Sequence, residues 1–161
     1  MNAIAIFTGE INGTVKFHQC DEDSECNIKI NLDGFKENKL RGIHIHSYGD
    51  TREGCESACE HFNPYNKLHG SRILHGGDRH LGDMMNNIES INGKVDIMYT
   101  DDLIDLYAPV EENIIGRMVV IHENMDNWGV GRNFDEESAT TGKAGKRIAC
   151  SPIVLCKPEH F

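Results

Sequence analysis

Two histidines separated by one residue, His44 and His46, are the pair whose spacing most directly suggests chemistry. Alternate side chains of a strand point to opposite faces, so Ile43 and Ile45 would face one side and both histidines the other. Two imidazoles on one face can reach a single metal ion. The alternative is a pair of histidines hydrogen-bonded at a strand edge. The tripeptide alone leaves both readings open, and the other ligand-type residues of the chain must decide.

Five further residues bring the candidate metal ligands to seven. They are His61, His69, His80, Asp83 and His122. The spacing of His80 and Asp83 lets both side chains turn toward one ion in a tight loop, and His122 ends an apolar strand that would hold it rigidly. Imidazole suits copper and zinc, whereas a set dominated by carboxylates would suit magnesium or calcium. Each histidine taken alone is more often structural, but together they favour a metal site.

The segments that would position these residues are short and β-prone. Strands are expected at 3–8, 14–18, 28–32, 43–46, 95–99, 103–107, 118–122 and 147–156. Asn12-Gly13 and Asn92-Gly93 are hairpin-turn signals. The pattern predicts one all-β domain over residues 1–161, built from eight strands as an antiparallel sandwich or small barrel.

Two long segments lack the alternation of these strands. The first runs from Gly49 to Met85 and carries four of the candidate ligands. A structureless loop of this length is usually functional or held by something other than a core, and a metal and a disulfide are the candidates. The second segment, Glu123 to Lys146, has a helical signal only near Asp135–Ser138.

Composition narrows the class of protein. A formal net charge of −10 argues against nucleic acid and anionic membranes as partners. No apolar run approaches the ~20 residues of a membrane helix. The N-terminal residues lack the basic region of a signal peptide, which predicts an intracellular, cytoplasmic protein. Most of the six cysteines are then expected to be reduced.

Five separate motifs, in order, resemble those of the copper/zinc superoxide dismutases. Gly42–Asp50, GIHIHSYGD, is similar to the family's GFHVHEFGD. The other four are Gly54-Cys55 with His61–Pro64 (GC…HFNP), Arg79–Asp83 (RHLGD, for RHVGD), Val119–Glu123 (VVIHE, for VVHE) and Gly142–Cys150 (GKAGKRIAC, for GNAGSRLAC). The resemblance covers essentially the whole chain. It implies an eight-stranded antiparallel Greek-key barrel or sandwich, immunoglobulin-like, with two long functional loops.

The resemblance also implies the ligand sets and the reaction. Copper would be held by His44, His46, His61 and His122, and zinc by His61, His69, His80 and Asp83. His61 would bridge the two ions. Copper would alternate between two oxidation states, oxidising one superoxide anion to O2 and reducing the next to H2O2. Zinc has no redox chemistry and would be structural.

Further roles follow from the same resemblance. Asp126 would join His44 to His69, and such outer partners fix ring orientation. Arg147 would attract superoxide beside the copper, although a surface salt bridge is the alternative for this residue. Cys55 and Cys150 would form a disulfide. Glu136, Glu137 and Thr141 would line the substrate channel.

The remaining cysteines have no counterpart with a role in the family. Cys59 forms a C-x3-C pair with Cys55 and could pair with it instead. Cys20 and Cys26 flank an acidic turn and could bridge two strands. For these cysteines free thiols are the expectation.

The chain departs from the family in its channel loop. Asn124 and Thr140 stand where lysines are expected, and Lys143, Lys146 or Arg132 could replace the missing charge. We therefore expect the chemistry to survive with altered electrostatic steering.

The resemblance also bears on partners. It implies a homodimer through Tyr48-Gly49, Ile115-Gly116 and the end of the last strand. A copper chaperone is a further partner of the family, but no proline replaces Lys146 or Ile148, so strict dependence on it is not expected. The alternative function is a non-catalytic metal-binding or copper-chaperone-like domain on the same scaffold. The complete ligand set argues against it, and the three zinc-type residues argue against a copper-only relative.

Overall fold

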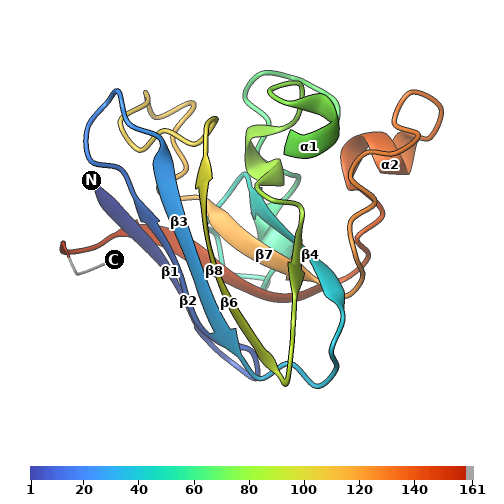
Figure 1. Cartoon of the computed structure of the whole chain (residues 1–161), viewed down its shortest axis with the longest axis horizontal. Helices are drawn as coiled ribbons and strands as arrows, with labels where there is room; N and C mark the ends of the chain where they lie inside the picture. Colours follow the sequence, from blue (N-terminus) through green and yellow to red (C-terminus); the bar gives the residue numbers. More distant parts are fainter. Residues whose placement is uncertain (159–161) are drawn as a thin grey trace.

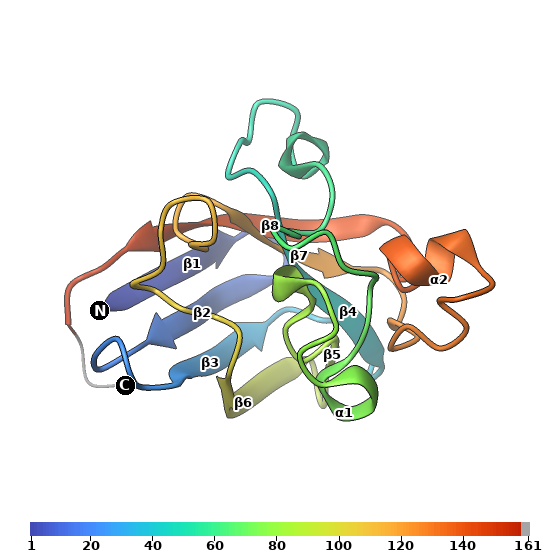
Figure 2. The ribbon, with the colours of Figure 1, turned by 90° about the horizontal axis from the view of Figure 1, so that it is seen from above.

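A computed structural model describes residues 1–158 and contains eight strands in one antiparallel sheet. The strands are β1 (Asn2–Thr8), β2 (Asn12–His18), β3 (Cys26–Asp33), β4 (Leu40–His46), β5 (Asn87–Glu89), β6 (Lys94–Asp101), β7 (Met118–His122) and β8 (Arg147–Leu155). Their order is β5-β4-β7-β8-β1-β2-β3-β6. The sheet curls into a nearly closed Greek-key barrel, and the two long loops extend from one side of it (Figures 1 and 2). The expected fold class is confirmed.

The first three strands follow the predicted alternation and close one side of the core. β3 buries Ile28, Ile30 and Leu32, while the residues between them are partly or fully exposed. β1 adds Ala3 and Ala5 from its inward face. Small residues in β1 let the larger side chains of the neighbouring strands fill the barrel interior, as close packing requires.

β4 and β7 are buried on both faces, which sets them apart from the other strands. Ile43 and Ile45 join the barrel core, so His44 and His46 face outward, as predicted. The outer face of β7 is covered by the first long loop, whose Ala58 packs on Met118. The outward histidines are therefore enclosed between the barrel and a loop, because that loop folds back over them.

Three details of the strand prediction are wrong. Asn12 and Gly13 do not form the first turn but pair with Thr8 and Phe7, so the turn is 9–11. The segment 103–107 is not a strand, although it buries two apolar side chains in the core. The eighth strand is instead β5, three residues that pair with β4 and are too short to show a period. The turn at Asn92-Gly93 is confirmed, with positive φ at both residues.

Each of the two long loops contains short helical segments. The first loop contains η1 (Glu56–Ala58), α1 (Arg72–His75) and η2 (Leu81–Asp83), and the second contains α2 (Glu136–Thr140). Asp135 caps α2 by accepting a hydrogen bond from the Ser138 amide, which confirms the helical signal there. Within residues 1–158 no helix is long and apolar enough to cross a membrane.

Candidate metal centre

The seven candidate ligands gather into two adjacent, buried groups. One contains four imidazoles, from His44, His46, His61 and His122, and the other contains His61, His69, His80 and Asp83. In each group the ligand atoms lie within 4.8 Å of one another. His61 is common to both. The structure thus brings together all the residues that the sequence marked as ligands, from two strands and the first loop.

Hydrogen bonds to the backbone orient two rings of the four-imidazole group. His46 Nδ1 lies 2.6 Å from the carbonyl oxygen of Cys59, and His122 Nδ1 lies 3.1 Å from that of Gly145. A carbonyl only accepts, so Nδ1 carries the proton in each ring and Nε2 keeps its lone pair. The two Nε2 atoms face each other at 3.3 Å. Two electron-pair donors therefore converge on one point.

The other two rings complete this arrangement. His44 Nε2 lies 2.6 Å from Asp126 Oδ2, which leaves Nδ1 buried without a hydrogen-bond partner among the described residues. The same is true of Nε2 of His61. A buried unpaired nitrogen is costly unless something binds it. Four imidazole nitrogens aimed inward fit copper, which favours such ligands.

The second group is built around the carboxylate of Asp83. Its Oδ1 lies 3.1 Å from His61 Nδ1, 2.8 Å from His69 Nδ1 and 3.1 Å from His80 Nδ1. Its Oδ2 accepts hydrogen bonds from the amides of Gly70 and His80, both at 2.9 Å. Three imidazoles and one carboxylate are a donor set that tetrahedral zinc takes. The fully buried carboxylate is held in place by its own loop.

Asp126 links the two groups, because its carboxylate contacts one imidazole of each. Its Oδ2 lies 2.6 Å from His44 Nε2 and 2.9 Å from His69 Nε2. Two asparagines hold it: Asn86 donates to Oδ2, and Asn87 exchanges hydrogen bonds with the Asp126 backbone. The sequence reasoning missed both asparagines, and neither lies in a quoted motif. The sequence signal that could have pointed to them is their position within four residues of the RHLGD motif.

Burial sets the protonation of the four-imidazole group. Desolvation lowers the pKa of His44 and His61 well below the ordinary value and that of His46 to about 2. It also lowers the pKa of His122. Neutral imidazole is the form that binds a metal. The fold therefore keeps these rings in their ligating form at neutral pH.

In the second group, burial and hydrogen bonds shift the pKa values of His69 and Asp83 in opposite directions. For His69, burial opposes the charged ring, but hydrogen bonds to Asp126 and Asp83 outweigh it and raise the pKa to about 9. For Asp83, burial favours the neutral acid, yet hydrogen bonds from His61, His69 and His80 hold its pKa well below the ordinary range. The pocket thus stabilises a carboxylate together with a positive charge beside it, as a site for a cation requires.

One glycine of the second loop is required by close packing on this centre. Gly142 has φ +62, and a Cβ added there would lie 2.4 Å from His69 Nε2 and 2.7 Å from Asp126 Cγ. Any larger residue would displace the carboxylate that links the two groups. The second loop is therefore fitted to the metal centre through a backbone that only glycine allows.

Arg147 begins β8 beside the four-imidazole group. Its guanidinium donates to the carbonyl oxygens of Cys55 at 2.8 Å and Cys59 at 2.6 Å. Over residues 1–158 its hydrogen bonds go to carbonyls and it forms no ion pair, so its positive charge is not neutralised by a carboxylate. Because Cys59 also accepts from His46, one peptide group positions both the arginine and a ring of the four-imidazole group.

The expected channel residues lie on and after α2, and the three cations that could replace the missing lysines differ in their ion pairs. Glu136 and Glu137 are exposed on α2, and the backbone of Thr141 caps its end. Arg132 forms an ion pair with Asp78, and Lys143 forms one with Asp135. Lys146 is exposed next to Arg147 and has no ion-pair partner among the described residues. The three candidates are therefore not equivalent, and Lys146 keeps its charge unpaired.

One further loop histidine, His75, and the cysteines lie outside the two ligand groups. The Nδ1 atom of His75 accepts from the Ser71 amide at 3.0 Å. Cys55 and Cys150 form the expected disulfide. Cys20, Cys26 and Cys59 are free thiols, so neither alternative pairing forms.

Removing the disulfide should destabilise the protein by about 4 to 5 kcal/mol, because it closes a loop with a sequence separation of 95. The expected loss is measured by urea unfolding of a Cys55→Ser, Cys150→Ser double variant. Cys59→Ser is the matched control and should change the free energy of unfolding by less than about 1 kcal/mol, as exposed sites do. Equal stability of the double variant and the wild type would contradict the entropic account of this bridge.

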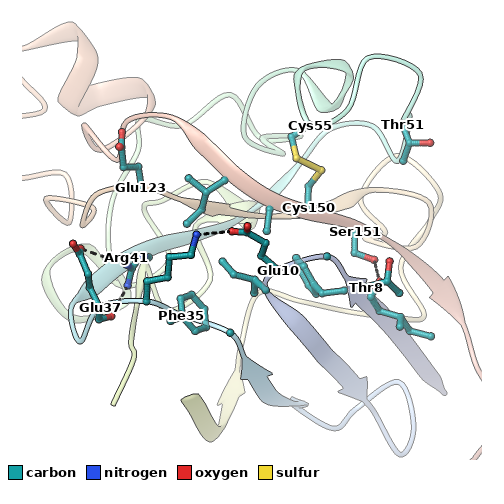
Figure 3. A pocket seen from close by; sticks show the side chains of 18 of the residues that line it. Thr8, Glu10, Phe35, Glu37, Arg41, Thr51, Cys55, Glu123, Cys150 and Ser151 are labelled. Atoms are coloured by element: carbon teal, nitrogen blue, oxygen red, sulfur yellow. Dashed lines mark hydrogen bonds and ion pairs between the residues drawn. A yellow bond between two sulfur atoms is a disulfide. The ribbon is translucent and has the colours of Figure 1, made fainter. Parts of the chain in front are cut away.

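A groove of about 890 Å³ lies outside the metal centre (Figure 3). Residues of β1, β4 and β8 line it with the disulfide, and none of the described histidines does. Lys36 and Glu10, which both line it, form an ion pair. The imidazole groups are enclosed rather than open, which agrees with a site for small ions instead of a large organic ligand.

These features define a class: an all-β barrel metalloprotein whose four-imidazole site and imidazole–carboxylate site share one histidine. Comparison with known proteins agrees. The family model for copper/zinc superoxide dismutase matches residues 11–153. Superoxide dismutase (Cu-Zn) of Paramecium bursaria Chlorella virus 1 is 42% identical over 164 residues, covering 100% of this chain and 81% of the viral protein.

Cellular relatives and a solved structure extend the match. Superoxide dismutase (Cu-Zn) of Saccharomyces cerevisiae is 40% identical over 157 residues, covering 96% of this chain and 98% of the yeast protein. The crystal structure of the clock protein EA4 has a TM-score of 0.84 and 35% identity, covering 96% of this chain and 94% of that one. This chain belongs to the copper/zinc superoxide dismutase family.

Proposed function

We propose how the residues of this superoxide dismutase divide the work of converting two superoxide anions into O2 and H2O2. His44, His46, His61 and His122 hold copper, and His61, His69, His80 and Asp83 hold zinc. Bound copper supplies one-electron chemistry by alternating between Cu(II) and Cu(I), and zinc is structural. The family and the donor sets support copper and zinc as the two metals.

The observation that carries the proposal is the position of His61. Its Nδ1 faces the carboxylate group and its Nε2 faces the other imidazoles, so one ring serves both sites. Nε2 is also the atom at which this ring can take up a proton and pass it to the reduced product. The test is a superoxide assay on protein whose copper and zinc content has been measured. Protein with both metals bound and no activity would favour the alternative of a non-catalytic or chaperone-like domain.

Arg147 is the residue that we assign to attract and orient the superoxide anion. The guanidinium is always charged and offers several donors in one plane. On a chain with net charge −10, an unpaired cation next to the copper ligands outweighs the distant negative charges, because salt screens interactions beyond about 8 Å. Glu136, Glu137 and Thr141 belong to the loop that shapes the approach to it.

Neutralising Lys146 should lower the rate constant with superoxide about two- to fivefold at low salt, because the anion loses local attraction. The matched control is Lys143→Gln, whose charge is already paired with Asp135, so it should change the rate less. Rates measured over a range of salt concentrations check both. If the wild-type rate does not fall with added salt and Lys146→Gln has no effect, Lys146 does not replace the missing channel lysines.

The homodimer proposal is supported by the adjacency of the three segments that the resemblance implies for the interface. The Gly49 amide donates to the Gly116 carbonyl at 2.8 Å, and the Gly116 amide donates to Ile153 at 2.8 Å, so the three expected interface segments lie side by side. Tyr48 in the first segment and Leu155 in the last have exposed hydrophobic side chains. Light scattering should give twice the 18.1 kDa of one chain. A mass of 18.1 kDa at micromolar concentration would refute the dimer.

Two further proposals concern the location of the protein in the cell and the way it acquires copper. We propose a cytoplasmic location, which agrees with the free thiols of Cys20, Cys26 and Cys59. We also propose that copper can be loaded without a chaperone, because Lys146 and Ile148 stand where proline accompanies strict dependence in relatives. Activity of the protein produced in a host lacking that chaperone tests the second proposal, and loss of copper in that host would refute it.

A further inference from the structure

Three polar side chains meet on the outer face of the barrel, away from the metal ligands. They come from Asn2 in β1, from His18 at the end of β2 and from Cys20 two residues later. Asn2 and His18 are direct cross-strand partners. His18 Nδ1 lies 2.8 Å from Asn2 Oδ1, and His18 Nε2 lies 3.4 Å from Cys20 Sγ. The thiol, the imidazole and the amide therefore form one chain of hydrogen bonds.

The amide determines which nitrogen of the imidazole carries the proton. The oxygen of Asn2 can only accept, so Nδ1 of His18 donates to it. In the neutral ring Nε2 then keeps its lone pair, and this is the atom that faces the thiol. Nε2 can take the proton of Cys20 and leave a thiolate, which is the reactive form of cysteine. A thiol beside a base that a third group orients is the arrangement of an activated nucleophile.

The backbone that carries Cys20 is anchored on both sides. The Gln19 side chain is buried and bonds the Ser24 carbonyl and the Leu106 amide. Tyr107 donates its hydroxyl to the Cys20 carbonyl at 3.2 Å. The thiol is thus held beside the ring by contacts with the loop 102–117, although Cys20 itself is exposed. Access from solvent and a fixed base coincide at this residue.

The surroundings select the kind of reagent that can reach the thiol. Asp21, Glu22 and Asp23 follow directly and are exposed, so the local field is negative. Anionic reagents are repelled by it, whereas a small neutral oxidant is not. Hydrogen peroxide is such an oxidant, and it is the product of the reaction assigned to the metal centre.

We propose that Cys20 is a peroxide-reactive thiol that His18 activates and Asn2 positions. The Cys20 thiolate attacks one oxygen of H2O2, an S–O bond forms and the O–O bond breaks. The leaving hydroxide takes the proton that His18 Nε2 holds, giving water. The sulfur loses two electrons and the peroxide gains two, so the products are a sulfenic acid and water. This chemistry places a second, peroxide-sensing site on the enzyme.

The test is brief exposure of the metal-loaded enzyme to added H2O2, followed by trapping with a 1,3-dione that labels sulfenic acids and by peptide mass spectrometry. Because peroxide is added, the result does not depend on the proposed dismutation. Cys20 should carry the label well before Cys59, which is also exposed but has no imidazole hydrogen-bonded to its sulfur among the described residues. Cys26 should stay unlabelled, since burial raises the pKa of its thiol to about 12.

Two variants distinguish activation of the Cys20 thiol by His18 from simple exposure of that thiol to solvent. His18→Gln should slow labelling of Cys20 by about tenfold or more, the size of a general-base contribution. Asn2→Ala should slow it less, since it only loosens the ring. Alkylation of the urea-unfolded variants should equal that of unfolded wild type, and their dismutase activity should be unchanged. Equal labelling of Cys20 and Cys59 in the folded wild type, or an undiminished rate in folded His18→Gln, would overturn the proposal.

Discussion

Replacing His122 with alanine should lower dismutase activity by more than about 100-fold, because even the outer partners of metal ligands cost ~10- to 100-fold when removed. His122 Nε2 faces His46 Nε2 at 3.3 Å, so its loss leaves the four-imidazole group open on one side. The zinc set contains no atom of His122. Zinc content should therefore stay near one per chain while copper binding and activity fall.

The measurement combines metal analysis with a superoxide assay on the same sample. His75→Ala is the matched control: it removes a histidine of the first loop that lies outside both ligand groups. Its activity should stay near that of the wild type. Full activity of His122→Ala with copper still bound would show that this histidine is not a copper ligand and would undo the residue assignment.

Replacing Asp83 with asparagine should have the largest effect on stability. The carboxylate contacts three imidazoles and two amides and is fully buried. Removing one partner from such a buried charged network costs about 3 to 5 kcal/mol. Zinc binding should fall as well, because the only anionic ligand is lost. Thermal unfolding and zinc content of the purified variant check both effects.

The matched control for this variant is Asp78→Asn. Asp78 also pairs with a cation, Arg132, but its side chain is 64% exposed, so the loss should be at most about 1 kcal/mol. If Asp83→Asn keeps its zinc and loses no more stability than Asp78→Asn, the carboxylate does not hold the ion.

Acid should erase the difference between the wild type and Asp83→Asn. The pKa of Asp83 in the folded protein lies well below the ordinary value of 3.8, so the folded state binds fewer protons than the unfolded state. The stabilisation is therefore fully present above pH 3.8 and is lost as the pH falls below it. Unfolding measured at several acidic pH values should show the two proteins converging.

Local pattern was enough to determine much of this protein. The alternation of Ile43 and Ile45 with His44 and His46 predicted the strand and the face that each side chain takes. The ligand types predicted a metal site, and the resemblance of the five motifs to the family implied both ligand sets and the Cys55–Cys150 disulfide. The faces of the His44 strand can be predicted because a strand's side-chain period is a property of the local backbone.

Tertiary structure alone decided the rest. β5 is recognisable only through its pairing with β4, and Asn12-Gly13 forms a strand because Asn12 and Gly13 also pair with Asp33 and Leu32 of β3. Asn87 supports Asp126 across a separation of 39 residues.

The ion pairs of the second loop likewise could not be predicted from the sequence. Arg132 and Lys143 are engaged by Asp78 and Asp135, whereas Lys146 keeps an unpaired charge among the described residues. The triad of Asn2, His18 and Cys20 likewise exists only because β1 and β2 pair in this register. Interactions of this kind depend on distances between segments remote in the chain, and a one-dimensional pattern contains no measure of those distances.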